Sequence, residues 1–387
     1  MKTSPSYKYI DTVNTLKDLT LKVKKSEQVA VDTEADSLHH YFEKVCLIQI
    51  TLGETNYIVD PLVELDLSDF FNALSEKPLI LHGADYDLRM LQSSFGFRPK
   101  NRIFDTMIAA KLLGYEKFSL AALVNHFFNI TLKKQGQKSN WSKRPLTEAQ
   151  LEYACYDTHF LEEIADNLKG ELKKLDRHNW FNETVEFMVQ STENNKERDL
   201  DNAWQIKGTG HLKDYQLIFL QQIWHWREKI GAKKDIPTFK IMGNNQMIHL
   251  AAWAADNPSC LPEDFSGLPK NYSDSRIKNL EKAIKKARNT KKTAWPKFRK
   301  RKKPVHNKPG YKNLVKALKE ECTKIAENLK MNPSDIANNA ALELLASERP
   351  STLKEVYQCG HIMKWQAKLL YPYIQKIIKQ NFSHHGV

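Results

Sequence analysis

The stretch Gln28-Val29-Ala30-Val31-Asp32-Thr33-Glu34 decides the fold of the N-terminal half of this chain. The β-branched residues Val29 and Val31 favour a strand, and the strand ends in acidic residues. Side chains alternate between the two faces of a strand, so Asp32 and Glu34 point to the same side. Two carboxylates held together repel each other unless a proton or a cation shares the site. Mg²⁺ or Mn²⁺, which prefer oxygen ligands, would explain the pair; a solvated acidic turn is the alternative.

The composition is that of a globular protein, and 387 residues suffice for two or three domains. The formal net charge is +13, but residues 282–319 hold sixteen Lys and Arg and no Asp or Glu, so the surplus is local. Such a segment favours a nucleic-acid partner. The five scattered cysteines lack a Cys-x-x-Cys pair, which indicates reduced thiols and a cytoplasmic location. No apolar run approaches the ~20 residues of a membrane span, so we expect no membrane partner.

The second acidic motif lies in His82-Gly83-Ala84-Asp85-Tyr86-Asp87, where a short strand ends and a helix begins. Strand and helix patterns alternate up to this point, which predicts an α/β domain with a mixed sheet. Ligands commonly bind at the carboxyl edge of such sheets. We assign the helix cap to Asp85, because an Asp at that position accepts free amide hydrogens, and expect Asp87 to point into the site. If Asp87 faces away, Asp85 is the substitute.

The third motif lies on a helix whose start is marked by the capping-box pattern Thr147-Glu148-Ala149-Gln150. Tyr153 and Asp157 are four residues apart on this helix and share a face. Taken alone, the pair could also be a core tyrosine and a surface acid. The polar, basic segment before the helix, with Trp141 and Arg144, is typical of a loop at the mouth of a site.

Together, Asp32-x-Glu34, His82-Gly83-x-x-x-Asp87 and Tyr153-x-x-x-Asp157 resemble the motifs of the DEDDy 3′→5′ exonucleases in order, spacing and predicted element. The resemblance covers roughly residues 10–180 and is greatest to bacterial ribonuclease D; Leu47-Ile48-Gln49 and Phe104-Asp105-Thr106 support it. It implies an RNase H-like α/β fold. It also implies a metal-dependent 3′→5′ exoribonuclease that releases nucleoside 5′-monophosphates from single-stranded RNA 3′ ends, as in the trimming of tRNA and other stable RNAs.

The resemblance also implies a role for each motif residue. Asp32, Glu34 and Asp157 would hold one divalent ion, Mg²⁺ or Mn²⁺, and Asp32 would bridge to a second. Asp87 would support that second ion, partly through water. Tyr153 would orient the attacking water or hydroxide. Two such ions stabilise both the entering and the leaving oxygen of a displacement at phosphorus.

Three further residues beside the motifs are candidates for substrate contact. His82 and His159 could contact phosphate, and a partly buried supporting histidine is the alternative for each. Arg144 could bind the RNA backbone, and a solvated basic loop explains it nearly as well.

The C-terminal half shows two helical patterns. The first resembles an HRDC domain, a small nucleic-acid-binding module, and its best marks are the Trp226-Arg227 pair, which we take as substrate contacts, and a later Pro237. The other pattern resembles a divergent HRDC domain, in which Gln366 follows Trp365 where the module often has Arg. The predicted organisation is an exonuclease domain at 1–185, a linker at 186–209, HRDC-like domains at 210–290 and 310–382, and a basic linker at 291–309.

The basic segment is interpreted as a nucleic-acid contact, with Trp295 available to stack on an unpaired base. A solvated linker is the alternative. A monomer is expected if the two helical modules clamp the substrate. The sequence leaves two other functions open. The first is a DNA exonuclease of the repair or proofreading type, because the motifs do not distinguish RNA from DNA. The second is a binding protein that has lost catalysis.

Overall fold

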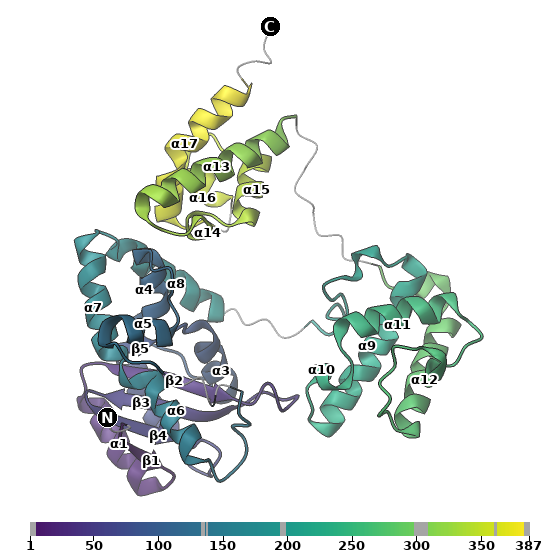
Figure 1. Ribbon diagram of the computed structural model, residues 1–387, viewed down its shortest axis with the longest axis horizontal. Coiled ribbons are helices and arrows are strands. Elements are labelled where there is room, and N and C mark those ends of the chain that lie inside the picture. The colour runs from purple at the N-terminus through teal and green to yellow at the C-terminus, as the bar shows by residue number, and fades with distance from the viewer. Residues whose placement is uncertain are drawn as a thin grey trace. The chain divides into compact units, whose positions relative to one another are not determined.

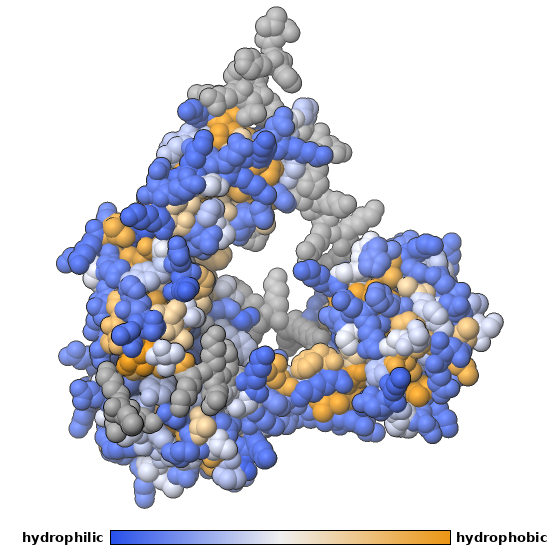
Figure 2. All heavy atoms as spheres, in the orientation of Figure 1, coloured by the Kyte–Doolittle hydropathy of each residue, from blue (hydrophilic) through white to orange (hydrophobic). Residues whose placement is uncertain are grey.

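The computed structural model describes residues 5–132, 136, 138–193, 199–297, 309–359 and 362–382. It divides the chain into two compact units. The first unit contains the described residues up to 35, those from 45 to 193 and those from 309 onward, and the second contains 36–44 and 199–297. None of the described helices is long and apolar enough to cross a membrane. The visible surface is largely hydrophilic, with apolar side chains in smaller patches (Figure 2).

A six-stranded mixed sheet lies in the N-terminal part of the first unit (Figure 1). The strand order is β1-β4-β3-β2-β5-β6; β3 is antiparallel to both neighbours and the other pairs are parallel. Asp32 lies opposite Gln49 and Glu34 opposite Leu47, and the register shifts directly after Glu34. The strands are β1 Tyr7–Ile10, β2 Val29–Ala35, β3 Val45–Leu52, β4 Thr55–Val59, β5 Leu79–Leu81 and β6 Ile103–Asp105.

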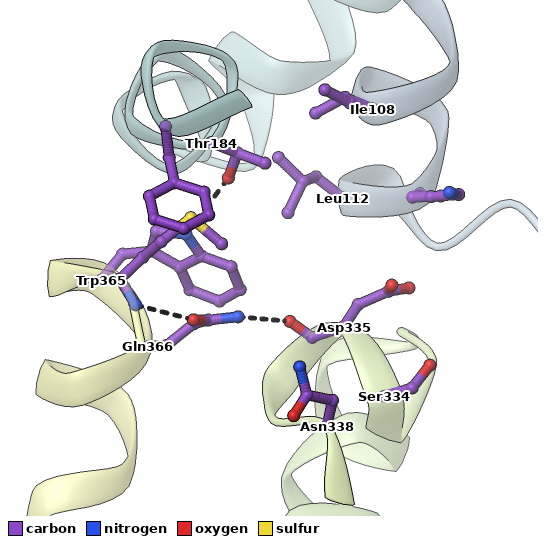
Figure 3. Close-up of a pocket in the computed structure, with 11 residues that line it drawn as sticks. Ile108, Leu112, Thr184, Ser334, Asp335, Asn338, Trp365 and Gln366 are labelled. Atoms are coloured by element: carbon purple, nitrogen blue, oxygen red, sulfur yellow. Dashed lines mark hydrogen bonds between the residues drawn. The ribbon is translucent and has the colours of Figure 1, made fainter. Parts of the chain in front are cut away.

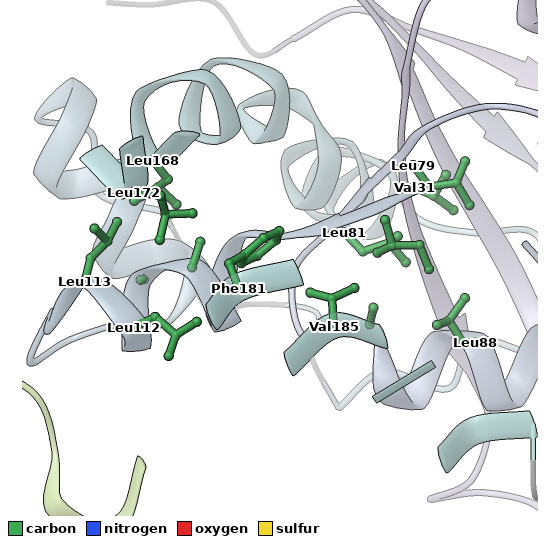
Figure 4. Packing of buried hydrophobic residues seen from close by; sticks show 14 of the residues in the cluster. Val31, Leu79, Leu81, Leu88, Leu112, Leu113, Leu168, Leu172, Phe181 and Val185 are labelled. Carbon is green, nitrogen blue, oxygen red and sulfur yellow. The ribbon is translucent and has the colours of Figure 1, made fainter. Parts of the chain in front are cut away.

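Helices pack against this sheet and bury the interior strand β2. Val29, Ala30 and Val31 are fully buried, as expected for a strand with a neighbour on each side. Figure 4 shows Phe181 and Val185 of helix α8 (His178–Glu193) packed in one cluster with Val31, Leu79 and other core residues. The helices are α1 Val13–Lys25, α2 Ser68–Ser75, α3 Asp85–Phe95, α4 Thr106–Leu113, α5 Leu120–Phe128, α6 Glu148–His159, α7 Leu161–Lys174 and α8 His178–Glu193.

The C-terminal helical module belongs to the first unit because it packs on α4 and α8. The Trp365 ring stacks on the Trp180 ring with centroids 4.6 Å apart. The Glu183 carboxylate accepts the backbone N–H groups of Lys364 and Trp365 at the start of α17. The Arg177 guanidinium donates to the carbonyls of Leu112 and Leu329 at 2.6 and 2.8 Å. The helices of the module are α13 Tyr311–Leu329, α14 Pro333–Ile336, α15 Asn339–Glu348, α16 Leu353–Gln358 and α17 Lys364–Phe382.

Figure 3 shows the polar part of this junction, beside a cavity of about 310 Å³. The Trp365 indole N–H donates to the Thr184 hydroxyl at 3.3 Å. The Gln366 amide donates to the backbone carbonyl of Asp335 at 2.9 Å. Trp365 docks the module on the N-terminal α/β domain, whereas Gln366 bonds within its own module. Both residues are buried and are therefore not available to nucleic acid.

The second unit is a helical module joined by residues 36–44, the loop that follows β2. Asp235 anchors this loop: its carboxylate accepts the backbone N–H groups of Tyr41 and Phe42 at 3.0 and 3.1 Å and bonds the His40 ring at 2.7 Å. The Tyr41 hydroxyl donates to Glu228 at 2.9 Å. The helices of this module are α9 Asp214–Lys234, α10 Thr238–Ile241, α11 Asn244–Asp256 and α12 Asp274–Asn289.

Two of the predicted domain boundaries differ from these elements. Helix α8 continues to Glu193, so the segment predicted as a linker from residue 186 begins inside a helix. Residues 36–44 group with the first helical module although the sequence places them in the exonuclease domain. Of the predicted basic linker at 291–309, residues 298–308 lie outside the described residues.

Candidate active site

The first motif lies where β2 ends. Alternation along the strand puts Asp32 and Glu34 on one face, and Thr33 between them faces the opposite side. Both acids keep part of their surface accessible, whereas Thr33 is buried. Asp32 and Glu34 are therefore acidic side chains at a partly open position on a rigid strand.

The second motif is fixed to β2 through Asp87. Its Oδ1 accepts the Thr33 hydroxyl at 2.6 Å and the Thr33 backbone N–H at 3.2 Å, and the side chain is buried. Asp85 lies in the first turn of α3, is exposed, and pairs with Arg89 at 2.6 Å. The N-cap of α3 is Ala84, without a side-chain cap, so the capping role expected for Asp85 is wrong. The structure thus brings Asp87, and not Asp85, to the end of β2.

The turn before α3 is held by Asp105 at the end of β6. Its Oδ1 accepts the backbone N–H of Gly83 at 3.1 Å and its Oδ2 that of Ala84 at 2.8 Å. Oδ1 also accepts two amides at the start of α4, those of Met107 and Ile108. In the sequence, Asp105 stands out only as part of the supporting motif Phe104-Asp105-Thr106. Its position after a strand and before a helix was the available signal for this bracing role.

His82 supports the same turn. Its Nδ1 lies 2.8 Å from the Thr106 hydroxyl, which itself donates to the Leu81 carbonyl at 3.2 Å. The Thr106 hydrogen is thereby used, so His82 Nδ1 is the donor of the first bond. Burial lowers the pKa of His82 to about 4, so the imidazole is neutral near pH 7. These bonds favour the supporting role for His82.

The third motif lies on α6, whose capping box between Thr147 and Gln150 is confirmed. Asp157 and Tyr153 follow on one face, and a hydrogen bond joins their side chains. Burial and the charge of Asp157 raise the pKa of Tyr153, which keeps its phenol protonated. Two residues further on, His159 bonds Asn56 through Nδ1 at 3.2 Å, an interaction that favours the supporting alternative.

The four motif carboxylates are coupled by their charges. Burial raises the pKa of Asp32 well above its usual range, and the charges of Asp87, Asp157 and Glu34 add to the effect. Burial and the charges of Asp157 and Asp87 raise the pKa of Glu34 to about 9. Burial and the charge of Asp87 raise that of Asp157 to about 8, and burial raises that of Asp87 to about 6. Three separate segments therefore converge on one acidic cluster.

The chemistry of this donor set fits divalent cations that prefer oxygen. Like charges that raise each other's pKa values are relieved by a bound cation, and the hard carboxylate oxygens are the ligands such a cation takes. Among the described residues, no three His, Cys, Asp or Glu are already gathered in a coordinating arrangement.

Comparison with known proteins identifies the family. Residues 7–173 match the model of a 3′–5′ exonuclease, and residues 216–261 and 312–378 match that of an HRDC domain. Ribonuclease D of Haemophilus influenzae is 28% identical over 346 residues, which cover 88% of this chain and 85% of that protein. The chain belongs to the ribonuclease D family. It is accordingly a 3′→5′ exoribonuclease with an exonuclease domain and two HRDC regions.

Solved structures agree with this fold. The chain superimposes on Escherichia coli ribonuclease D with a TM-score of 0.73 at 24% identity, over 97% of this chain and 99% of that one. The catalytic core of RRP6 from Trypanosoma brucei gives a TM-score of 0.59 at 26% identity, over 74% of this chain and 83% of that one. The ribonuclease D architecture thus extends across both helical modules.

Arg144, a candidate for substrate contact, has a structural role in this member of the ribonuclease D family. Its guanidinium binds both Asp60 oxygens at 2.6 and 2.7 Å and donates to the carbonyls of Trp141 and Cys46. A bidentate pair of this kind fixes the loop before α6 to the sheet. The prediction that Arg144 contacts the RNA backbone is therefore wrong: its donors are used within the protein.

The expected HRDC contacts Trp226 and Arg227 are likewise internal. Both are buried; Trp226 packs beside Tyr272, and Arg227 donates to the Met242 carbonyl and the Asn244 side chain at 3.0 and 2.8 Å. Their prediction as substrate contacts is wrong because the Trp-Arg pattern marks the core of the module. Trp295 packs partly against the same core, and its indole N–H donates to the Thr290 carbonyl at 3.0 Å.

Proposed function

We propose that this exoribonuclease removes nucleoside 5′-monophosphates from single-stranded RNA 3′ ends by a two-metal mechanism with Mg²⁺ or Mn²⁺. The observation that carries the proposal is the convergence of four mutually coupled carboxylates and one protonated tyrosine from three segments. Without a bound cation, four neighbouring carboxylates would repel one another with nothing to offset the cost.

Asp32, Glu34 and Asp157 would hold one ion, and Asp32 and Asp87 would serve the second. When bound, such a pair supplies an activated water and stabilises the negative charge on the entering and leaving oxygens. Asp87 is preoriented for this task because the hydroxyl and the backbone N–H of Thr33 hold its Oδ1.

Tyr153 would position the attacking water. The phenol remains protonated, and its hydrogen bond to Asp157 fixes the direction of its oxygen. A phenol oxygen fixed in this way can accept a hydrogen bond from water and hold it in line with the phosphorus. Asp105 and His82 would act by holding the turn that carries Asp87.

The substrates we propose are the 3′ ends of stable RNAs, including tRNA precursors. We also propose that the enzyme acts in the cytoplasm and is a monomer. The related E. coli enzyme is described as an exoribonuclease involved in structured RNA processing, which supports this substrate class. The basic charge outside the exonuclease domain also suits a long anionic polymer.

The test is a time course with 5′-labelled single-stranded RNA, and separately DNA of the same sequence, in Mg²⁺, Mn²⁺ or EDTA. A metal-dependent ladder that shortens from the 3′ end, faster on RNA and lost in Asp32→Asn, is the expected result. A faster ladder on DNA would move the protein to the repair class. Retarded but uncut RNA in every lane would overturn the catalytic proposal.

A further inference from the structure

The positive charge of the first helical module is concentrated at its end. Residues 199–273 contain eight Lys and Arg and eight Asp and Glu, whereas residues 274–297 contain nine Lys and Arg and two acids. All of these residues lie in the part of the chain that the structure describes, and this count leaves out residues 298–308 of the basic segment.

Helix α12 places much of this charge on one side of the module. Leu280, Ile284 and Ala287 are buried against the module core. The opposite side of the helix is exposed and carries four lysines. At 100° per residue they fall within about a 100° arc, and Glu281 at its margin pairs with one of them at 2.7 Å. We call them the lysine face: Lys278, Lys282, Lys285 and Lys286.

Helix stability does not explain this face. Lysines in a last turn are favoured by the negative end of the helix dipole, but Lys278 is the fifth residue of α12, near the positive end. Lys278 and Lys282 are four residues apart, as are Lys282 and Lys286, and like charges at that spacing repel. The two repulsive pairs outnumber the favourable Glu281–Lys285 ion pair on this face. This excess of like charge points to an anionic partner.

The same surface continues beyond the helix. Lys291 and Lys292 are exposed in the turn that follows, and the hydrogen bond from Trp295 to the Thr290 carbonyl holds this turn on the module. Trp226 and Arg227, the residues expected to contact RNA, are inside the core. What the outer face of α12 offers is lysine ammonium groups, which act as point charges and distinguish neither base nor sugar.

We propose that the lysine face binds the sugar-phosphate backbone of the RNA that is being trimmed, without sequence preference. The proposal rests on the exoribonuclease function and names the surface that retains the substrate. Each lysine that neutralises a phosphate of a single strand adds about 0.7 to the slope of log affinity against log salt.

The experiment compares two triple variants of the full chain. Lys278→Gln, Lys282→Gln and Lys286→Gln remove three charges from the lysine face. Lys229→Gln, Lys233→Gln and Lys234→Gln remove three exposed charges from α9 of the same module and serve as the control. Binding of labelled single-stranded RNA is measured in EDTA over a salt series, so that cleavage does not interfere, and a thermal melt of each variant checks folding.

The lysine-face variant should lose about 100-fold in affinity near 0.1 M salt, and its salt slope should fall by about 2. The control should bind like the unmodified chain, and DNA of the same sequence should be affected as RNA is. An unchanged slope in the first variant, or an equal loss in the control, would overturn the proposal. Binding is measured without metal, so this test is independent of cleavage. If the protein binds RNA through the lysine face but never cuts it, the catalytic proposal is refuted and the lysine-face proposal stands.

Discussion

Replacing Glu34 by Gln should stabilise the metal-free protein at alkaline pH, although it removes a proposed metal ligand. Burial and the charges of Asp157 and Asp87 raise the pKa of Glu34 from 4.5 to about 9. In the folded state the carboxyl therefore keeps a proton that the unfolded chain has released. Between these two pKa values the folded state binds more protons than the unfolded state, so stability falls as the pH rises. Gln is neutral at every pH and has nearly the same shape as protonated Glu.

The size of the effect follows from the same pKa values. Holding a proton at about pH 8 on a group whose ordinary pKa is 4.5 costs at most about 5 kcal/mol, at 1.36 kcal/mol for each unit. At about pH 5 the cost is below about 1 kcal/mol. Asp32 and Asp157 compete for the same protons, and Glu34 is partly accessible to water, so we expect a gain of about 2 kcal/mol at about pH 8.

The assay is thermal unfolding in EDTA at about pH 5 and about pH 8, repeated with Mg²⁺. For a unit of this size, about 2 kcal/mol corresponds to a rise in Tm of about 4–8 °C. The variant should show this rise only at the higher pH, and Mg²⁺ should stabilise the unmodified protein more than the variant. Asp85→Asn removes an exposed carboxylate close by in sequence and is the control. A variant that is no more stable at the higher pH, or a gain that is the same at both pH values, would refute the reasoning.

Three other substitutions separate catalytic from structural roles. Tyr153→Phe should lower the cleavage rate at saturating RNA about 100-fold while Mg²⁺ still raises the Tm, since it removes only the hydroxyl that orients water; a normal rate would contradict that role. Asp105→Asn should lower stability by about 2–3 kcal/mol and slow cleavage. Asp105 accepts four backbone N–H groups, and in the variant one of them meets the side-chain NH2, which cannot accept a hydrogen bond. Thermal melts and cleavage rates test the two effects. Trp226→Ala should destabilise its module by about 3–5 kcal/mol, measured by melting, as expected for a buried indole; weakened RNA binding with an unchanged melt would restore the contact role predicted from the sequence.

The sequence determined much of the acidic site because local periodicity is sufficient for it. Strand alternation puts Asp32 and Glu34 on one face, and helical spacing does the same for Tyr153 and Asp157. Charge counting located the basic surplus, and the motif order indicated the family. These inferences depend on the chain within a few residues of each motif.

The tertiary structure decided which candidates reach the site and which are consumed by the fold. Asp85 and Asp87 are both in the first turn of α3, and only the packing of α3 against Thr33 selects Asp87. Arg144 and Arg227 have the same chemistry as RNA-binding arginines, but partners far away in sequence or across the module occupy their donors.

The same holds for the helical modules. A Trp followed by a polar residue recurs at 226 and 365, and both tryptophans are buried: one within its own module, the other against Trp180 of the exonuclease domain. Sequence patterns fix the direction in which a side chain leaves its own helix or strand. Whether it then meets solvent, core or substrate depends on segments brought together by folding, because burial and long-range hydrogen bonds are properties of the packed chain.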